Sequence, residues 1–239
     1  RSEDVPQRSK VERFSYTKLD TYKQCGWKYK LQYVEGRFFA ADTIATSIGT
    51  LVHWIEQRIS EAYINGREPD YPALLEDFWN CNIPQKDKYD RTGGIQGVNF
   101  LRQKYVDEFY EIDKYGSSYA QRCKFYAEVG IYRQQKFLEE HPDIELVDVE
   151  KYFEYTYKGR LFSGYIDRIW RYKGTDQYII DDIKTKAAPF DEKNDVPTPL
   201  QMKIYTMALK SCYNLATEPD ECYWDLPFID MRQRAGTKG

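Results

Sequence analysis

The chain has 239 residues, of which 41% are hydrophobic and 31% are charged, and its mean hydropathy is −0.76. It is long enough for one large domain or two small ones, and it has no run of about eighteen apolar residues that would span a membrane. The formal net charge of −3 argues mildly against a non-specific nucleic-acid coat, which would be basic, although a basic path can be confined to one face.

The N-terminal residues 1–14 predict a flexible lead-in, and their polar start lacks the apolar segment of a signal peptide. The five cysteines are scattered, and none forms a Cys-x-x-Cys pair. This distribution predicts reduced thiols in a cytoplasmic protein.

Helical spacing of apolar residues dominates the N-terminal half, residues 15–140. Ser15 is expected to cap a helix that runs to Val34. A second helix, residues 43–64, carries a continuous apolar stripe and is expected to end at Asn65-Gly66. Further helices are expected over residues 72–82, 95–114 and 118–140.

Strand patterns begin after His141-Pro142, and residues 144–230 are expected to form a sheet core. Strands are predicted over residues 144–157, 160–172, 177–186 and 221–230, with a helix over residues 200–213 and a polar tail over 231–239. The order predicts a mixed α/β (α+β) fold, in which a central mixed β-sheet is flanked by helices and the N-terminal half is helical. Residues 15–230 are interpreted as a single domain.

A predicted hairpin carries three charged residues that need an explanation. Asp167 lies on its first strand, whereas Asp182 and Lys184 lie two residues apart on the second strand and share one face. A divalent metal and a phosphate would account for these charges on otherwise apolar strands, whereas a cross-strand salt bridge is the alternative. Asp181 faces the opposite side and is expected to be a structural acid, hydrogen-bonded beneath the sheet.

The helix over residues 43–64 carries His53 at the edge of its apolar stripe. Gly49 lies one turn earlier, where a glycine would let another element approach closely. A lone histidine beside an apolar face is more often structural, but an imidazole is also compatible with Mn²⁺. Glu56, one turn later, could orient His53 or be a solvated helix acid, and the second interpretation is preferred.

These motifs, in this order, resemble the PD-(D/E)xK nuclease superfamily and, within it, the RecB-like exonuclease branch. The resemblance spans residues 15–206 and rests on Gly49-x-x-x-His53, Gly164-x-x-Asp167, Asp182-x-Lys184-Thr185 and Gln201-x-x-x-Tyr205. It implies a restriction-endonuclease-like core and a site that hydrolyses phosphodiester bonds with a metal-activated water. Asp-x-Lys alone is a weak signal, whereas the ordered set is a strong one.

The resemblance also implies roles for individual residues. Ligands of Mg²⁺ or Mn²⁺ would be His53, Asp167, Asp182 and the backbone carbonyl of Ile183, with Glu150 as a further acidic position. Asp167, Asp182 and Lys184 would be catalytic, with Lys184 acting on the attacking water. Gln201 and Tyr205 would contact the substrate. Apart from the resemblance, the basic side chains of Lys186 and Arg168 are also expected to bind it. A wider DNA path is expected along Lys28, Lys30, Arg37, Arg160, Lys203 and the aromatic residues Trp27, Phe38 and Phe39, although such lysines are usually solvated and such aromatics usually lie in the core.

The sequence therefore predicts a divalent-metal-dependent DNA exonuclease that acts in DNA repair, recombination or phage DNA processing. The alternatives are a nucleic-acid-binding scaffold on the same fold, and a structure- or sequence-specific endonuclease. Cys25 matches the first ligand of the iron–sulfur cluster found in some RecB-like nucleases, but Cys212 and Cys222 alone follow the core, so no cluster is expected. The expected partner is linear or single-stranded DNA, and a helicase or recombinase would be a separate chain because no phosphate-binding ATPase loop is present.

Overall fold

The computed structural model describes residues 12–37, 43–83, 94–185, 199–216, 221–225 and 227–228. The chain divides into two compact units. The smaller unit takes residues 1–39, 152–165 and 198–218, and the larger unit takes residues 40–151, 166–197 and 219–239. Whether both units together act as the single domain predicted for residues 15–230 stays a prediction.

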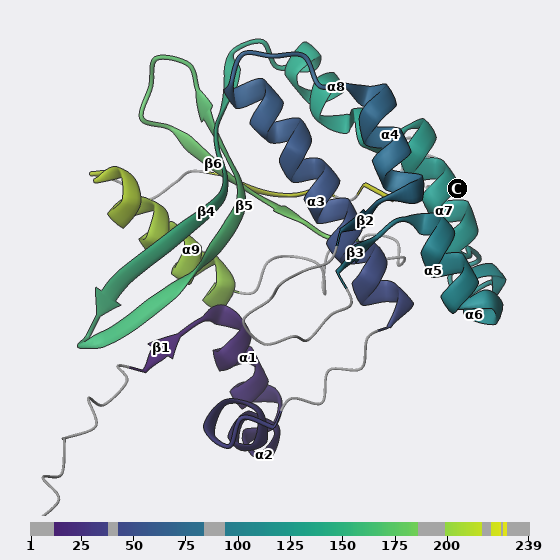
Figure 1. Cartoon of the computed structure of the whole chain (residues 1–239). Helices are drawn as coiled ribbons and strands as arrows, with labels where there is room; N and C mark the ends of the chain where they lie inside the picture. The colour runs from purple at the N-terminus through teal and green to yellow at the C-terminus, as the bar shows by residue number, and fades with distance from the viewer. Residues whose placement is uncertain are drawn as a thin grey trace, which may run out of the picture. The chain divides into compact units, whose positions relative to one another are not determined.

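Helices make up most of the described part of the first 140 residues, and long strands follow them (Figure 1). The helices are α1 (Tyr16–Gln24), α2 (Gly26–Tyr29), the π-helical η1 (Lys30–Val34), α3 (Ile44–Ile64), α4 (Tyr71–Asn80), α5 (Val98–Lys104), α6 (Val106–Tyr110), α7 (Tyr119–Glu128), the 3₁₀-helical η2 (Gly130–Tyr132), α8 (Arg133–Glu140) and α9 (Pro199–Tyr213). The strands are β1 (Arg13–Phe14), β2 (Asn82–Ile83), β3 (Ile95–Gln96), β4 (Ile144–Tyr157), β5 (Arg160–Tyr172), β6 (Tyr178–Ile183) and β7 (Glu221–Asp225).

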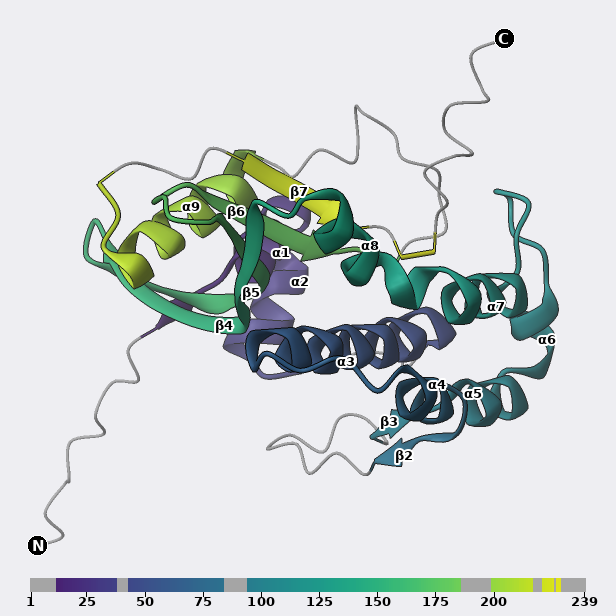
Figure 2. The ribbon, with the colours of Figure 1, turned by 90° about the horizontal axis from the view of Figure 1, so that it is seen from above.

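The main sheet is mixed, which confirms the predicted fold class. In the larger unit β6 pairs antiparallel with β5, with Arg168 opposite Asp181, and β6 also pairs parallel with β7, as Figure 2 shows from above. In the smaller unit β1 pairs parallel with the start of β5. Strand β4 also pairs with β5. Each of these two strands has residues in both units: the division falls after residue 151 in β4 and after residue 165 in β5.

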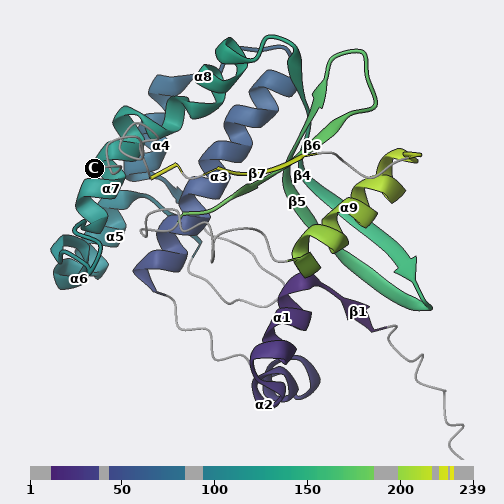
Figure 3. The same ribbon diagram turned by 180° about the vertical axis from the view of Figure 1, so that it is seen from behind.

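Helix α3 is the centre of the larger unit's core. Thr43 and Thr46 form a capping box at its start, and Gly66, at a φ of +65°, follows its end, as the Asn65-Gly66 signal predicted. Its apolar stripe is fully buried and consists of Ile48, Leu51, Val52, Ile55 and Ile59. Helices α4 and α8 lie beside it in Figure 3. Each of these buried side chains contributes roughly 1.5–3 kcal/mol, so the stripe holds the helix in place.

The smaller unit differs from the prediction at its N-terminal end. Ser15 caps α1 as expected, but the predicted helix to Val34 is divided at Cys25. Cys25 is extended, and its Sγ accepts the N–H of Lys28, so it ends α1 and starts α2. Arg13 and Phe14 also form β1 rather than belonging to a flexible lead-in.

The larger unit also departs from the expected helix boundaries. The helix expected over residues 95–114 begins instead with strand β3, is broken at Tyr105 and ends at Tyr110. The helix expected over residues 118–140 is interrupted at Gly130, where a Cβ would stand 2.3 Å from the carbonyl oxygen of Pro227. Only glycine allows the chain to pass this closely. The last strand ends at Asp225, and the predicted tail lies outside the described residues.

Candidate metal centre

Helix α3 and the end of β6 approach each other closely at Gly49. A Cβ placed on Gly49 would stand 3.1 Å from Oγ1 of Thr185, which is tighter than ordinary van der Waals contact. Glycine at this position therefore lets the strand end pass against the helix, as the sequence suggested. His53, one turn further along α3, consequently projects beside the residues that end β6.

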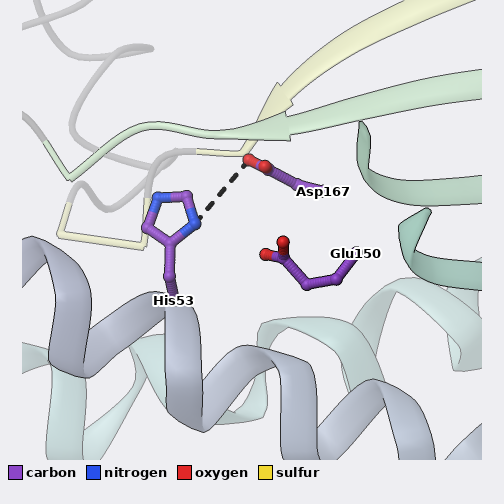
Figure 4. Close-up of side chains that lie close together, drawn as sticks. All are labelled: His53, Glu150 and Asp167. Carbon is purple, nitrogen blue, oxygen red and sulfur yellow. Dashed lines mark ion pairs between the residues drawn. The ribbon is translucent and has the colours of Figure 1, made fainter. Parts of the chain in front are cut away.

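Three side chains from different elements converge at this place. His53 comes from α3, Glu150 from β4 and Asp167 from β5, and one potential ligand atom of each lies within 4.8 Å of the others (Figure 4). The Nδ1 atom of His53 is 3.8 Å from Oδ2 of Asp167, and these side chains are 33% and 16% exposed. An imidazole nitrogen and carboxylate oxygens at this spacing are donors that suit Mg²⁺ or Mn²⁺.

Glu150 reaches this group from an unusual backbone conformation. Its φ is +46°, in the left-handed region that residues with a Cβ rarely occupy. Such a conformation costs about 1–3 kcal/mol and is frequently found at functional sites. The strained backbone coincides with a carboxylate that points towards His53 and Asp167.

Ile183 connects the ligands through its backbone. Its N–H donates a hydrogen bond of 2.8 Å to Oδ2 of Asp167. His53 makes a hydrogen bond to the Ile183 backbone that favours the protonated imidazole, so the backbone atom is the carbonyl acceptor. The carbonyl predicted as a metal ligand is therefore beside the imidazole.

Asp182 and Lys184 adjoin this group as an ion pair between the Nζ and Oδ2 atoms. The alternative explanation of these charges was a cross-strand salt bridge. A salt bridge is present, but it joins Asp182 of β6 to Lys184, which directly follows the same strand. Asp182 is buried and is not part of the three-residue group, but it is close enough for Asp167 to affect its pKa. The backbone N–H of Lys184 donates 2.8 Å to the carbonyl of Asp225, which fixes the chain at the end of β6.

Two carboxyl groups at the centre, those of Asp182 and Glu150, hold their protons unusually strongly. Burial raises the pKa of Asp182 to about 6, with a further contribution from Asp167, although Lys184 opposes the shift. Burial and Asp167 raise the pKa of Glu150 to about 7. Burial lowers the pKa of His53, which favours the neutral imidazole that binds metals. A bound cation would reverse the shifts of the acids, because it favours their charged forms.

The predicted substrate-binding residues have different outcomes. Gln201 and Tyr205 lie four residues apart on α9 in the smaller unit, where Tyr205 packs edge-on against Phe153, so their action at the centre stays a prediction. Lys186 lies outside the described residues, as do Phe38 and Phe39. Trp27 is exposed, as are Lys28, Lys30 and Arg37, as a DNA path requires.

The predicted role of Arg168 in substrate binding is wrong. Its side chain is 1% exposed and pairs with three carboxylates. The partners are Glu56 at 3.1 Å, Asp181 at 2.8 Å and Asp225; we call Arg168 and these three acids the ionic cluster. The guanidinium is fully surrounded, so it has no surface left to offer a phosphate.

The interpretation of Glu56 as a solvated acid is also wrong. Glu56 is 1% exposed, and it accepts hydrogen bonds from Tyr126 at 2.6 Å and from Gln134 at 2.8 Å. By contrast, the prediction for Asp181 is confirmed: it lies beneath the sheet, where it accepts a 2.9 Å hydrogen bond from Trp170. Asp225 also pairs with Arg133 at 2.7 Å, and no local signal in the sequence identified it.

The comparison with known protein families agrees with this geometry. The model of the PD-(D/E)XK nuclease superfamily matches residues 13–237, nearly the whole chain, so the chain belongs to this superfamily of metal-dependent nucleases. No curated protein matches its sequence. Superfamily members typically use a divalent metal and act on nucleic acid, which agrees with the donor set of His53, Glu150 and Asp167.

Proposed function

We propose that the protein is a divalent-metal-dependent DNA exonuclease of the RecB-like branch. The observation that carries the proposal is the convergence of His53, Glu150 and Asp167 beside the Asp182–Lys184 pair, in a chain that belongs to the nuclease superfamily. Glycine at position 49 and the motif around Gln201 and Tyr205 support the RecB-like assignment. Action in DNA repair, recombination or phage DNA processing, and in the cytoplasm, is part of the proposal.

The proposed ion is Mg²⁺ or Mn²⁺, held by the side chains of the centre and the Ile183 carbonyl. The side-chain ligands are His53, Glu150, Asp167 and Asp182. When bound, the ion supplies Lewis acidity, which lowers the pKa of a bound water and offsets negative charge on the scissile phosphate.

Lys184 is the proposed partner of the attacking water. Its ammonium group carries three N–H donors and a positive charge at the rim of the centre, and Asp182 fixes its direction. In this position it can orient the water and stabilise charge that develops at the phosphate. Gln201, Tyr205 and Lys186 are the proposed contacts to the DNA backbone. No iron–sulfur cluster is part of the proposal.

Two substitutions test this function. Asp182→Ala and Lys184→Ala are each expected to abolish cleavage of end-labelled linear DNA with Mg²⁺ or Mn²⁺, while circular dichroism shows the fold retained. Lys151→Ala is the matched control, because Lys151 also pairs with an aspartate (Asp148, 2.6 Å) but lies outside the centre. Cleavage at the wild-type rate by a folded Asp182 or Lys184 variant would refute the proposal.

The substrate form separates the remaining alternatives. An exonuclease needs an end, so it degrades linear DNA and leaves closed circular DNA intact, whereas an endonuclease cuts both. A nucleic-acid-binding scaffold would bind DNA without a catalytic ion and would cut neither. The same comparison with single-stranded and double-stranded ends defines which strand form is preferred.

A further inference from the structure

We infer that the ionic cluster of Glu56, Arg168, Asp181 and Asp225 positions the metal centre, by holding α3, β5 and β6, which carry His53, Asp167 and Asp182, in fixed register with β7. The inference rests on the proposed function, because it concerns the same site. None of the four side chains contacts the ligand atoms of the centre in the described structure. They are therefore positioning residues rather than catalytic ones.

Three members of the cluster lie on the same element as a residue of the centre, and the fourth, Asp225, reaches the centre through a backbone hydrogen bond from Lys184. Arg168 follows Asp167 on β5, and Asp181 precedes Asp182 on β6. Adjacent residues on a strand point to opposite faces, so the same two strands carry the cluster on one face and the centre on the other. The register places Arg168 directly opposite Asp181, which fixes the two strands at the level of the ligands.

The other two members, Glu56 and Asp225, connect α3 and β7 to the guanidinium of Arg168. Glu56 lies one turn after His53 on α3, and its Oε2 atom accepts Arg168 at 3.1 Å. Asp225 ends β7, pairs with Arg168 through its side chain and accepts the N–H of Lys184 through its backbone carbonyl. A shift of either element would therefore move His53 or Lys184 relative to Asp167.

The composition of the cluster favours positioning over simple stabilisation. Buried ion pairs are poor sources of stability, because the cost of removing charges from water offsets most of their attraction. Two of the contacts are nevertheless directional, because Arg168 donates hydrogen bonds through Nη1 to Glu56 and through Nη2 to Asp225, whereas Asp181 pairs with Nε by charge. Tyr126 and Gln134 restrict Glu56 further, since both donate to its carboxylate. The arrangement thus permits little adjustment of α3 against β5.

The test measures metal affinity without DNA and without turnover. Calorimetric titration of MnCl₂ into the full chain is compared for wild type, Asp225→Asn and Glu56→Gln. Both substitutions keep the shape of the side chain, and at pH 8, above the pKa of about 7 of Glu56, both also remove its charge. The matched control is Ile59→Val, which lies on α3 in the same core, is fully buried and takes no part in the cluster.

The two cluster variants are expected to bind Mn²⁺ roughly 10- to 100-fold more weakly than wild type, the usual loss for residues behind the ligands. The Mn²⁺ affinity of Ile59→Val should remain within about twofold of wild type, even if its Tm falls as much as that of the cluster variants. In cleavage assays the cluster variants should lose kcat while KM for DNA stays nearly constant, because the cluster does not face the substrate. If Asp225→Asn does not fold, the Mn²⁺ affinity of Glu56→Gln alone tests the inference.

Folded cluster variants with a wild-type Mn²⁺ affinity would overturn the inference and leave the proposed function intact. The inference is also refuted if Ile59→Val weakens binding equally, because the loss would then follow stability alone. Failure of wild type itself to bind Mn²⁺ or cleave DNA would refute the proposed function, and the inference with it.

Discussion

Replacing Glu56 by glutamine should change how stability depends on pH. Burial raises the pKa of Glu56 to about 7 from its usual 4.5, although Arg168 lowers it. The folded state therefore holds a proton that the unfolded state has lost between these two values. The contribution of this group to stability is complete below pH 4.5 and is lost as the pH rises towards 7. At about 1.4 kcal/mol per pH unit, the full loss is about 3 kcal/mol.

Glutamine has nearly the same shape and does not titrate, so the variant lacks this loss. We expect the free energy of unfolding of wild type, relative to Glu56→Gln, to fall by about 2.5 kcal/mol between pH 5 and pH 8. Urea unfolding followed by circular dichroism at pH 5, 6, 7 and 8 measures it, provided that the m-values of the two proteins agree. The other carboxyl groups titrate in both proteins and largely cancel in the difference.

The matched control is Glu61→Gln, on the same helix but exposed. Its stability relative to wild type should stay constant over this range. A difference between wild type and Glu56→Gln that also stays constant within about 0.5 kcal/mol would refute the reasoning, because Glu56 would then titrate alike in the folded and unfolded states.

Three further predictions concern the centre itself. Gly49→Ala should weaken Mn²⁺ binding several-fold, because its Cβ would press on Oγ1 of Thr185, and adding Thr185→Ala should restore it; additive losses in the double variant would contradict this contact. Since Glu150 has a φ of +46°, Glu150→Gly should be about 1 kcal/mol more stable to urea than Glu150→Ala, and equal stabilities would show that no strain is stored there. Because the pKa of Glu150 is raised to about 7, Mn²⁺ affinity should increase several-fold from pH 6 to pH 8, and Glu150→Gln should weaken this increase.

Local signals in the sequence predicted those parts of the structure that are decided locally. Helix α3 was expected over residues 43–64 and is found over Ile44–Ile64, because an apolar stripe and a terminal Asn-Gly coincide. The alternation of side chains on β6 separated Asp181 from Asp182 correctly, since that alternation is a property of the strand itself. Gly49 was likewise recognised as a place of close approach.

The ionic cluster could not be predicted because its members meet only after folding. Glu56 receives hydrogen bonds from residues 70 and 78 positions away, and it pairs with Arg168 at a distance of 112 positions. On α3 alone Glu56 resembles any helix acid, and Arg168 beside Asp167 resembles a residue that could reach DNA. The division of the first helix at Cys25 was missed for a related reason: a cysteine as N-cap is not a recognised signal.

The two faces of β5 and β6 also differ in how their charges are balanced. On the cluster face, three carboxylates meet two buried or half-buried cations, Arg168 and Arg133. On the opposite face, the carboxylates of Glu150, Asp167 and Asp182 meet a histidine whose pKa is lowered, and Lys184 is the cation that the described structure pairs with them.

Fully ionised, those three acids and one ammonium leave a formal charge of −2. Without a counter-charge, burial and the neighbouring charge of Asp167 favour the protonated forms of Glu150 and Asp182, whose pKa values are raised to about 7 and about 6. A divalent cation would supply the missing charge, which agrees with the donor set of His53, Glu150 and Asp167 on this face. Binding of Mn²⁺ near pH 6 should therefore release protons, and titration in buffers of different ionisation enthalpy measures their number. Binding without proton release would contradict this account of the charges.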